Sequence, residues 1–168
     1  STGGNITVDA TDGQIDMAVG IYTTTSGLAD IAYTAGTDII LSQLTSVSGN
    51  ISVTSDAGTI SLNAPLSSTS GDIIVAGDVV EQNVNLSTGG AGALSVTADA
   101  GTITMANGVN SVTVAGDIVY SSALDMFLVS LTTTAGSINL TADAGEVALG
   151  AAVSSGSGAI NVVGDTVV

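Results

Sequence analysis

Hydrophobic and polar residues alternate along most of the chain in short runs that predict β-strands. Ile51-Ser-Val53 and Thr59-Ile-Ser-Leu62 show this period of two, in which one face of a strand is buried and the other faces water. Gly, Asp, Asn and Ser interrupt the runs every five to eight residues, as turns require. No window carries the i, i+3, i+4, i+7 stripe of an amphipathic helix. The pattern therefore predicts an all-β protein.

Similar segments recur along the sequence. Residues 5–15, 50–60, 93–103 and 137–147 resemble one another, and their last residues are 45, 43 and 44 positions apart. A second set with a tighter turn lies between them, at residues 31–39, 73–79, 112–118 and 160–165. Two slightly different units of about 22 residues therefore alternate to give a 44-residue superperiod.

Each unit predicts one coil, and the second inward residue of its first strand marks its register. These residues are Val8, Tyr33, Val53, Val75, Val96, Val114, Leu140 and Val162. The steps between them are 25, 20, 22, 21, 18, 26 and 22 residues, too few for a propeller blade. They fit a right-handed parallel β-helix of seven to eight coils, a β-solenoid forming a single domain over residues 1–168. Stacking at ~4.8 Å gives a rod of roughly 35–38 Å.

Four segments depart from the regular pattern. Residues 22–27, 65–71 and 151–158 are expected to be flexible loops on the third side of the solenoid. Residues 121–131 break the pattern most, and we expect a longer strand with one extra inward residue there. The alternative for this segment is a local plug or a small exposed apolar patch.

Composition excludes many kinds of site. The 168 residues contain no Lys, Arg, His or Cys against fifteen Asp and Glu, a formal net charge of −15. Disulfides, His or Cys metal sites, His-dependent triads and basic nucleic-acid surfaces are therefore impossible. The hydrophobic content of 45% excludes a disordered acidic tail, and aromatic residues at 2% require an aliphatic core. No run approaches the roughly 18 apolar residues of a membrane helix.

Residues 49–62 (Gly-Asn-Ile-Ser-Val-Thr-Ser-Asp-Ala-Gly-Thr-Ile-Ser-Leu) and the matching residues 136–149 carry a family resemblance. They resemble the repeats of filamentous-haemagglutinin-type bacterial adhesins, which are exported by two-partner secretion, and the resemblance covers essentially the whole chain. It implies an extracellular shaft at the cell surface, with no catalytic, cofactor-binding or metal-ligating residues to carry over. The chain departs from the family in lacking its N-terminal secretion domain and any basic residue.

The leading hypothesis is thus an extracellular structural protein, either the shaft of a surface adhesin or the self-assembling subunit of a secreted filament. Neither residues 1–4 nor residues 164–168 resemble a cap, so the expected partner is a neighbouring repeat or a second copy stacked head to tail. The absence of Lys and Arg removes every trypsin-type cleavage site, which favours a protease-exposed, extracellular location. No nucleic-acid partner and no membrane insertion are expected.

Other functions stay open at this stage. A glycan- or cell-binding module would use loops near Tyr22, Tyr120 and Phe127. An ice-binding solenoid would need a strict rank of Thr, whereas the matching positions read Thr7, Ser52, Ser95 and Asn139. Pectin-cleaving β-helices need basic residues, or carboxylates that a polyanionic substrate would not approach here, so we expect no enzyme.

Two polar patterns predict further chemistry. Asn5, Asn50, Asn85 and Asn139 stand in glycosylation acceptor sequences, and three of the four are expected at the start of a leading strand as turn residues. An Asp is expected in the turn after the leading strand of every coil: Asp12, Asp38, Asp56, Asp78, Asp99, Asp117, Asp143 and Asp165. If these carboxylates stack as a ladder at ~4.8 Å, they predict weak Ca²⁺ bridging; no other cofactor is expected.

Overall fold

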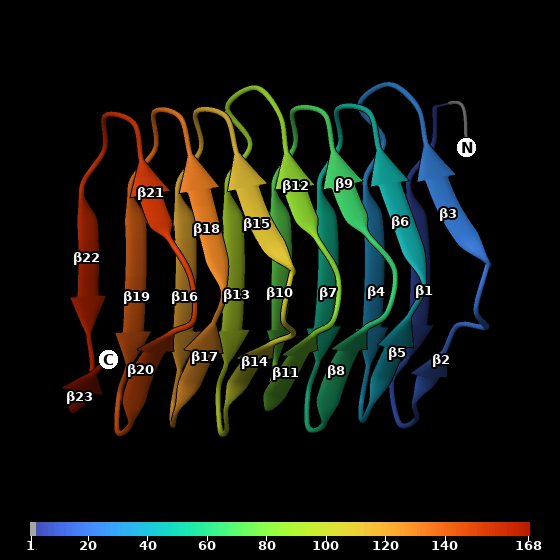
Figure 1. Cartoon of the computed structure of the whole chain (residues 1–168). Coiled ribbons are helices and arrows are strands. Elements are labelled where there is room, and N and C mark those ends of the chain that lie inside the picture. The colour runs from blue at the N-terminus through green and yellow to red at the C-terminus, as the bar shows by residue number, and fades with distance from the viewer. Residues whose placement is uncertain (1–2) are drawn as a thin grey trace.

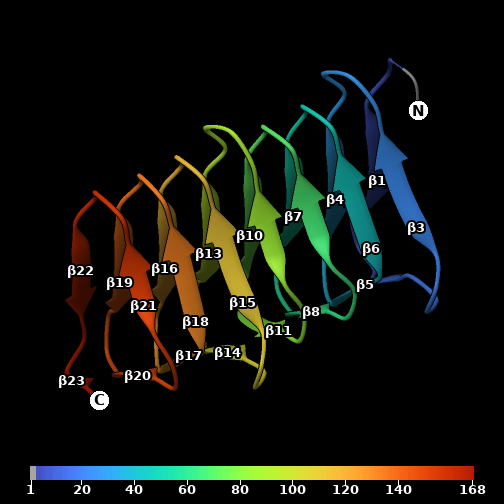
Figure 2. The same cartoon turned by 45° about the horizontal axis from the view of Figure 1, so that its top comes forward.

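The period-two runs fold as short parallel β-strands that wind around one axis. The computed structural model describes residues 3–168, which contain three parallel sheets and no helix. Each of the first seven coils adds one strand to sheet A, then to sheet B, then to sheet C (Figures 1 and 2). The chain rises in the front sheet, passes over the top and descends in the rear sheet while it advances toward the C-terminus, so the winding is right-handed (Figure 1).

Sheets A and B each contain eight strands. Sheet A consists of β1 (Ile6–Ala10), β4 (Ile31–Ala35), β7 (Ile51–Ser55), β10 (Ile73–Gly77), β13 (Leu94–Ala98), β16 (Ile118–Ser122), β19 (Ile138–Ala142) and β22 (Ile160–Val163). Sheet B consists of β2 (Ile15–Asp16), β5 (Ile39–Leu41), β8 (Thr59–Leu62), β11 (Val79–Gln82), β14 (Ile103–Met105), β17 (Met126–Leu128), β20 (Glu146–Leu149) and β23 (Thr166–Val167).

Sheet C contains seven strands. They are β3 (Tyr22–Thr25), β6 (Gln43–Ser46), β9 (Leu66–Ser68), β12 (Leu86–Thr88), β15 (Asn110–Thr113), β18 (Ser130–Thr133) and β21 (Val153–Ser155). Three consecutive strands make one coil, so coil 1 is β1–β3 and coil 7 is β19–β21, while coil 8 is β22 and β23. Seven strand spacings separate β1 from β22, which gives a length of about 34 Å.

Inward residues stack on their counterparts in the next coil and form the core. The first inward column of sheet A is Ile6, Ile31, Ile51, Ile73, Leu94, Ile118, Ile138 and Ile160. The second column is Val8, Tyr33, Val53, Val75, Val96, Tyr120, Leu140 and Val162. Between coils 2 and 7 these side chains are buried, so an aliphatic interior fills the rod as the alternation predicted.

The predicted register was wrong in one coil. Tyr120, not Val114, holds the second inward position of coil 6, and Val114 is 48% exposed in the turn after β15. Val-Ala-Gly-Asp occurs twice, at residues 75–78, where it ends the sheet A strand β10, and at residues 114–117, in the turn between sheets C and A. The same four residues therefore occur at two different corners, and the sequence alone does not distinguish them. With Tyr120 in place the steps become 25, 20, 22, 21, 24, 20 and 22 residues.

Most of the expectations for the irregular segments were also wrong. The predicted third-side loops at residues 22–27, 65–71 and 151–158 contain β3, β9 and β21, strands of a continuous sheet C. Residues 121–131 hold no plug and no extra inward residue, because they cover the end of β16, a turn, β17 and the start of β18. The alternative of a small exposed apolar patch agrees better with the structure, since Phe127, the outward residue of β17, is 55% exposed and Leu124 in the preceding turn is 45% exposed.

The strand lengths and side-chain contacts of the coils repeat with a period of four coils. Coils 2, 3 and 4 align without a gap on coils 6, 7 and 8 at an offset of 87 residues, and coil 1 aligns on coil 5 at 88. Tyr33 then matches Tyr120, and Asp38 matches Asp125. The Met17 and Met105 sulfurs match too, since each accepts a backbone N–H from the next coil at 3.3 Å. The 44-residue spacing of inward residues is thus half of a longer, four-coil repeat.

Candidate functional site

At the corner between sheets C and A, an inward hydroxyl lies at the end of coils 1 to 7 and a glycine follows it in coils 2 to 7. Each sheet C strand ends on an inward Ser or Thr: Thr25, Ser46, Ser68, Thr88, Thr113, Thr133 and Ser155. The Ser68 hydroxyl donates to the carbonyl of Gly49 in the preceding coil at 3.0 Å and accepts the N–H of Gly71 at 2.9 Å. Thr133 joins Gly116 to Gly136 in the same way. The hydroxyls therefore link successive coils inside the rod.

Asn and Asp side chains form a second set of links on the outside of this corner. The residue immediately before a sheet A strand accepts the backbone N–H of the equivalent residue in the next coil, as Asn5 does from Asp30 at 2.9 Å. Asp30 accepts from Asn50 at 2.8 Å, and Asn50 accepts from Asp72 at 2.9 Å. Asp72 and Asp117 continue the pattern. Each link satisfies a backbone donor that the turn leaves unpaired.

The four glycosylation acceptor sequences do not share one position. Asn5 and Asn50 precede sheet A strands, as predicted, and their side-chain oxygens serve as turn acceptors. Asn85 instead precedes β12 in sheet C and accepts the N–H of Asn110 at 3.0 Å. Asn139 lies within β19 and accepts the Nδ2–H of Asn161 at 2.8 Å. The expectation of three in the same slot was wrong, and glycosylation itself stays a prediction.

We expect Asp117→Ala to destabilise the rod by about 1 kcal/mol, because it removes the acceptor of the Ser137 N–H at 2.7 Å. Asp117→Asn keeps an oxygen in the same place and should cost less than half as much. Chemical denaturation followed by circular dichroism measures both values. Equal losses in the two variants would show that the charge, not the hydrogen bond, matters at this corner.

The predicted ladder of eight carboxylates is not present. Asp117 lies at the corner between sheets C and A, and Asp125 takes its place in the turn before β17. Asp38 and Asp125 lie one residue before the first inward residue of sheet B in their coils and accept the N–H of Thr59 and Glu146, each at 2.8 Å. Asp78 and Asp99 lie two and four residues before that position, so they are not stacked on Asp38 and Asp125. In residues 3–168 no three carboxylates are grouped closely enough to hold a metal ion. Weak Ca²⁺ binding stays a prediction, but the stack of Asp carboxylates on which it was based is not found in residues 3–168.

A ring of three polar side chains lies inside the rod, among the aliphatic side chains of the core. The Tyr120 hydroxyl donates to Gln82 Oε1 at 2.6 Å and lies 2.7 Å from the Ser111 Oγ. Gln82 Nε2 donates to Ser111 Oγ at 3.0 Å and to the Val84 carbonyl at 3.0 Å. All three side chains are fully buried and come from sheets A, B and C. Every polar group of the ring has a hydrogen-bond partner, and sliding one coil against the next would break these bonds. The ring therefore fixes the register of coils 4 to 6.

This ring could not be recognised in the sequence, because its residues form a pattern only after the coils are aligned. Ser111 occupies the sheet C column that holds Leu44, Leu66, Leu86 and Leu131 in other coils. Thr23 is the other hydroxyl in that column, and its Oγ1 lies 2.6 Å from the Tyr33 hydroxyl. Wherever a tyrosine enters the sheet A column, the preceding coil therefore replaces a leucine with a hydroxyl residue.

Burial of Tyr120 predicts a loss of stability at alkaline pH. Desolvation raises the pKa of the Tyr120 phenol well above its ordinary value, although hydrogen bonds from Ser111 and Gln82 act in the opposite direction. Unfolded tyrosine ionises near pH 10, so the stabilisation is complete below about pH 10 and is lost as the pH rises further. We expect the free energy of unfolding to fall by at most about 1.4 kcal/mol per pH unit from this residue.

Denaturation from pH 8 to 12 measures this slope. Tyr120→Phe should be less stable at pH 8 but show a shallower decline above pH 10. Parallel declines in the two proteins would contradict the assignment of the slope to Tyr120.

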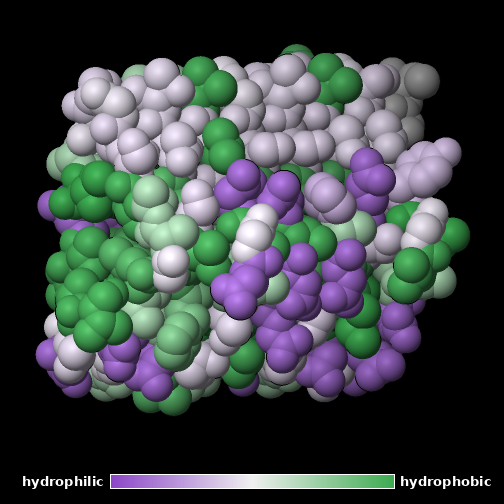
Figure 3. Space-filling model, viewed as in Figure 1, coloured by the Kyte–Doolittle hydropathy of each residue, from purple (hydrophilic) through white to green (hydrophobic). Residues whose placement is uncertain are grey.

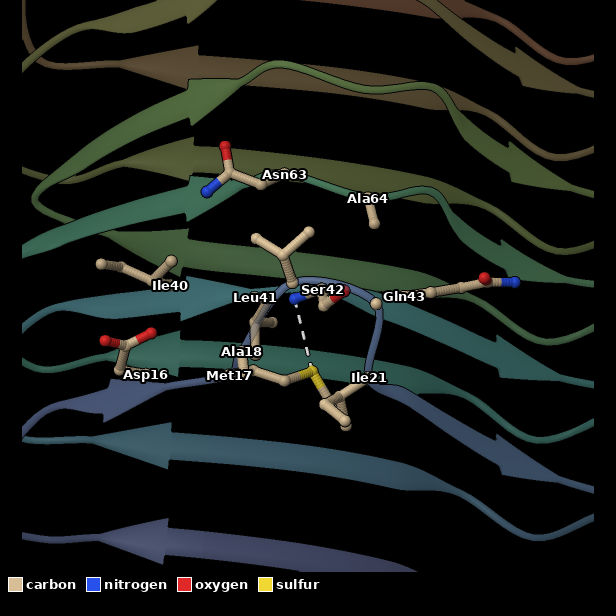
Figure 4. Close-up of a pocket in the computed structure, with 12 residues that line it drawn as sticks. Asp16, Met17, Ala18, Ile21, Ile40, Leu41, Ser42, Gln43, Asn63 and Ala64 are labelled. Atoms are coloured by element: carbon tan, nitrogen blue, oxygen red, sulfur yellow. Dashed lines mark hydrogen bonds between the residues drawn. The ribbon is translucent and has the colours of Figure 1, made fainter.

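A hollow of about 350 Å³ opens on the side of the rod, where the long loop of coil 1 passes coils 2 and 3 (Figure 4). Met17, Val19, Ile21, Ile40 and Leu41 are the large apolar side chains of its lining, and the Met17 sulfur accepts the Ser42 N–H. Asp16, Gln43 and Asn63 supply the polar groups at its edge. With one carboxylate and no base or cation beside it, this hollow offers no acid–base pair.

A second hollow lies at the N-terminal end of the rod. Ile6 and Val8 of β1, Tyr22 and Thr23 of β3, and Tyr33 of β4 line it, and its volume is about 720 Å³. These are inward positions of the first coils, apart from Tyr22. The hollow is therefore the open end of the core.

The predicted aromatic anchors do not form one surface. Tyr120 is fully buried, which contradicts its assignment to a recognition loop. Tyr22 is 69% exposed on sheet C in coil 1, and Phe127 lies on sheet B in coil 6. Both belong to strands rather than loops and lie on different sides of the rod.

Polar and apolar side chains are unevenly distributed on the surface. Hydrophilic residues gather over the middle of the rod, and hydrophobic residues gather over the C-terminal coils (Figure 3). The described part of the chain includes no helix that is long and apolar enough to cross a membrane. Comparisons with protein-family models, with curated proteins and with solved structures give no match for this chain.

Proposed function

We propose that this protein is a structural rod, a shaft segment of an extracellular or cell-surface protein. The observation that carries the proposal is the continuity of coil-to-coil bonding. Sheets A and B run through all eight coils, and buried hydroxyls and exposed Asn and Asp side chains add further links along the axis. Such a rod sets a distance between whatever lies at its two ends. The net charge of −15 favours solubility, and the lack of Lys and Arg protects it from trypsin-type proteases.

If the protein is a shaft, deleting whole coils should shorten the rod and leave its fold intact. Deletion of residues 51–93 removes coils 3 and 4, one double coil, and joins Asn50 to Leu94 as Asn50 is now joined to Ile51. We expect a folded rod about 10 Å shorter, since two strand spacings are lost. Small-angle X-ray scattering gives the length, and thermal melting gives the stability.

The matched control is a deletion of residues 51–82, which joins a sheet A position to a sheet B–C corner. It should leave the chain largely unfolded, because inward and outward residues no longer align. If the in-phase deletion is as unstable as this control, the coils are not independent length units and the shaft proposal fails.

A binding module is the second candidate, supported by the exposure of Tyr22 and Phe127. Aromatic side chains are common anchors for glycans and protein partners. A double Tyr22→Ser and Phe127→Ser variant should leave the rod length unchanged, and loss of binding across a glycan panel would favour this function. Ice binding has less support, since Ile74, Val119 and Asn139 interrupt the outward column that begins at Thr7.

A further inference from the structure

Asn107 and Gly108 form the exposed tip of the loop that joins β14 to β15. The Val109 N–H donates to the Ala106 carbonyl at 3.2 Å, and Gly108 has a φ of +80°. Together these features define a type II turn with Asn107 and Gly108 at its centre. The turn belongs to coil 5, with coils on both sides of it, so its exposure does not depend on the ends of the rod.

The amide of Asn107 and the backbone nitrogen of Gly108 are both free to react. Asparagine is among the chemically labile residues of proteins, because a nucleophile can attack its amide carbon. In the described part of the chain, residues 3–168, neither the Asn107 side chain nor the Gly108 N–H makes a hydrogen bond. A Cβ at residue 108 would meet no atom within 4 Å, so the space beside this nitrogen is open.

Other asparagines are held in positions where the following nitrogen cannot react. The N–H that follows Asn5 donates to the Asp30 carbonyl at 2.9 Å, and the N–H that follows Asn50 donates to the Asp72 carbonyl at 2.8 Å. Three more asparagines lie within strands, at residues 110, 139 and 161. Asn107 is also the only asparagine of the chain that is followed by glycine. Sequence and structure therefore single out the same residue.

We propose that Asn107 is a site of spontaneous deamidation, a modification that needs only water and hydroxide. Hydroxide removes the proton of the Gly108 nitrogen, which then attacks Cγ of Asn107. The bond between Cγ and Nδ2 breaks, the leaving nitrogen takes a proton from water and departs as ammonia, and a succinimide ring remains. Water then opens the ring at either carbonyl. One opening gives aspartate, and the other gives isoaspartate, in which the backbone runs through Cγ.

The turn must open before the Gly108 nitrogen can reach Cγ. A single backbone hydrogen bond of 3.2 Å closes it, between Val109 and Ala106. Exposed turns with so few bonds open locally at a small fraction of the free energy of global unfolding. The reaction is therefore expected to proceed in the folded rod and not only in the unfolded chain.

Deamidation changes both the charge and the backbone of coil 5. It adds one negative charge to the formal net charge of −15. The loops between sheets B and C otherwise contain no Asp or Glu in residues 3–168, so this is a new charge on that corner. Isoaspartate also lengthens the turn by one backbone carbon. Val109, which is 7% exposed and belongs to the core, should then be displaced and the rod should melt at a lower temperature.

Coil 1 contains an unreactive counterpart of this turn. The Ile21 N–H donates to the Ala18 carbonyl at 3.2 Å, and Gly20 has a φ of +82°, so the same type II turn is formed with Val19 in place of Asn107. Asn107→Val therefore reproduces a turn that the rod already contains. It should fold normally and serves as the matched control.

The test is incubation of the folded protein at pH 6 and at pH 9, followed by ion-exchange chromatography. The wild type should convert to a more acidic species, faster at pH 9 because the reaction requires hydroxide. Asn107→Val should not convert, and Gly108→Ala should convert more slowly because its methyl group crowds the nitrogen. Peptic peptide mapping by mass spectrometry locates the change, and methylation by protein isoaspartyl methyltransferase detects isoaspartate.

A second arm compares the folded rod with the chain unfolded in urea at the same pH. Conversion at residue 107 in the folded rod supports the proposal. A folded wild type that keeps its charge at pH 9, or conversion at another asparagine before Asn107, would overturn it. So would conversion that occurs in urea alone.

The effect on the fold is measured with Asn107→Asp, which carries the same charge on an unaltered backbone. The isoaspartate fraction should melt below this variant. Equal melting temperatures would show that the longer backbone does not displace Val109, and would overturn that consequence of the modification.

Discussion

Replacing Gly116 with alanine should destabilise the rod by about 3 kcal/mol or more, the largest effect that we expect from a single added methyl group. Gly116 is one of six glycines stacked at the corner between sheets C and A, with Gly49, Gly71, Gly92, Gly136 and Gly158. A Cβ at residue 116 would lie 2.0 Å from the carbonyl oxygen of Gly92 and 2.4 Å from its carbon. Backbone atoms cannot move aside cheaply, so the coils would have to separate.

The hydrogen bonds at this corner increase the expected loss. The Gly116 carbonyl accepts the hydroxyls of Thr113 at 2.6 Å and of Thr133 at 3.1 Å. A shift of Gly116 away from Gly92 would strain both bonds, and both hydroxyls are buried. Thermal melting should show a decrease in Tm of about 6–12 °C for a chain of this size.

Alanine substitutions at two other glycines distinguish close contact between coils from an unfavourable backbone conformation as the cause of such a loss. Gly13→Ala meets no atom within 4 Å at an ordinary backbone conformation, so it should change stability by less than about 0.5 kcal/mol. Gly108→Ala also meets open space, but its φ of +80° disfavours a side chain, so a loss of about 1 kcal/mol is expected. Equal losses for Gly116→Ala and Gly108→Ala would show that close approach of the coils is not the reason for the glycine column.

The coil architecture could be predicted from sequence because the inward columns of sheets A and B are aliphatic and alternate with polar residues. Ile51-Ser-Val53 and Thr59-Ile-Ser-Leu62 have only one reasonable interpretation. Sheet C could not be recognised in the same way. Strands such as Leu66-Ser-Ser68 turn a hydroxyl inward, and burial is tolerated because the Ser68 hydroxyl bonds to the glycine backbone. In the sequence such a strand is indistinguishable from a polar loop.

The error at Val114 has a related cause. A turn sequence specifies a local bend, but not the corner of the solenoid at which the bend is used. Val-Ala-Gly-Asp follows a sheet A strand at Asp78 and precedes one at Asp117, where Gly116 is required by contact with the preceding coil. The correct alignment depends on which residues stack between coils, and that is long-range information. The same missing information concealed the four-coil repeat and the ring around Tyr120.

Removing one member of that ring should cost more than removing the whole ring. Tyr120→Phe leaves Gln82 Oε1 and the Ser111 hydroxyl without their shared partner in a fully buried place, so a loss of about 2 kcal/mol is expected. Gln82→Leu alone should cost a similar amount, because it leaves the Tyr120 and Ser111 hydroxyls with only each other. In both variants the unpaired polar groups have no water to bind.

The other coils show how an apolar version of the ring is packed. The columns that hold Tyr120, Gln82 and Ser111 hold Val75, Leu62 and Leu66 elsewhere in the rod. A triple variant, Tyr120→Val with Gln82→Leu and Ser111→Leu, reproduces these residues and leaves no buried polar side chain unpaired. The larger leucines compensate for the volume lost at residue 120. We therefore expect its free energy of unfolding to lie within about 1 kcal/mol of the wild type.

A mutant cycle over the three positions measures this coupling directly. Urea denaturation gives the free energy for each single, double and triple variant, and the interaction energy is the departure from additivity. The singles should be less stable than the triple variant, with a coupling of about 3 kcal/mol or more, since the three losses share one cause. Additive losses, with the triple variant the least stable of all, would mean that the polar ring stabilises the core rather than fixing its register. In that case the Thr23–Tyr33 and Ser111–Tyr120 pairs would contribute to stability alone.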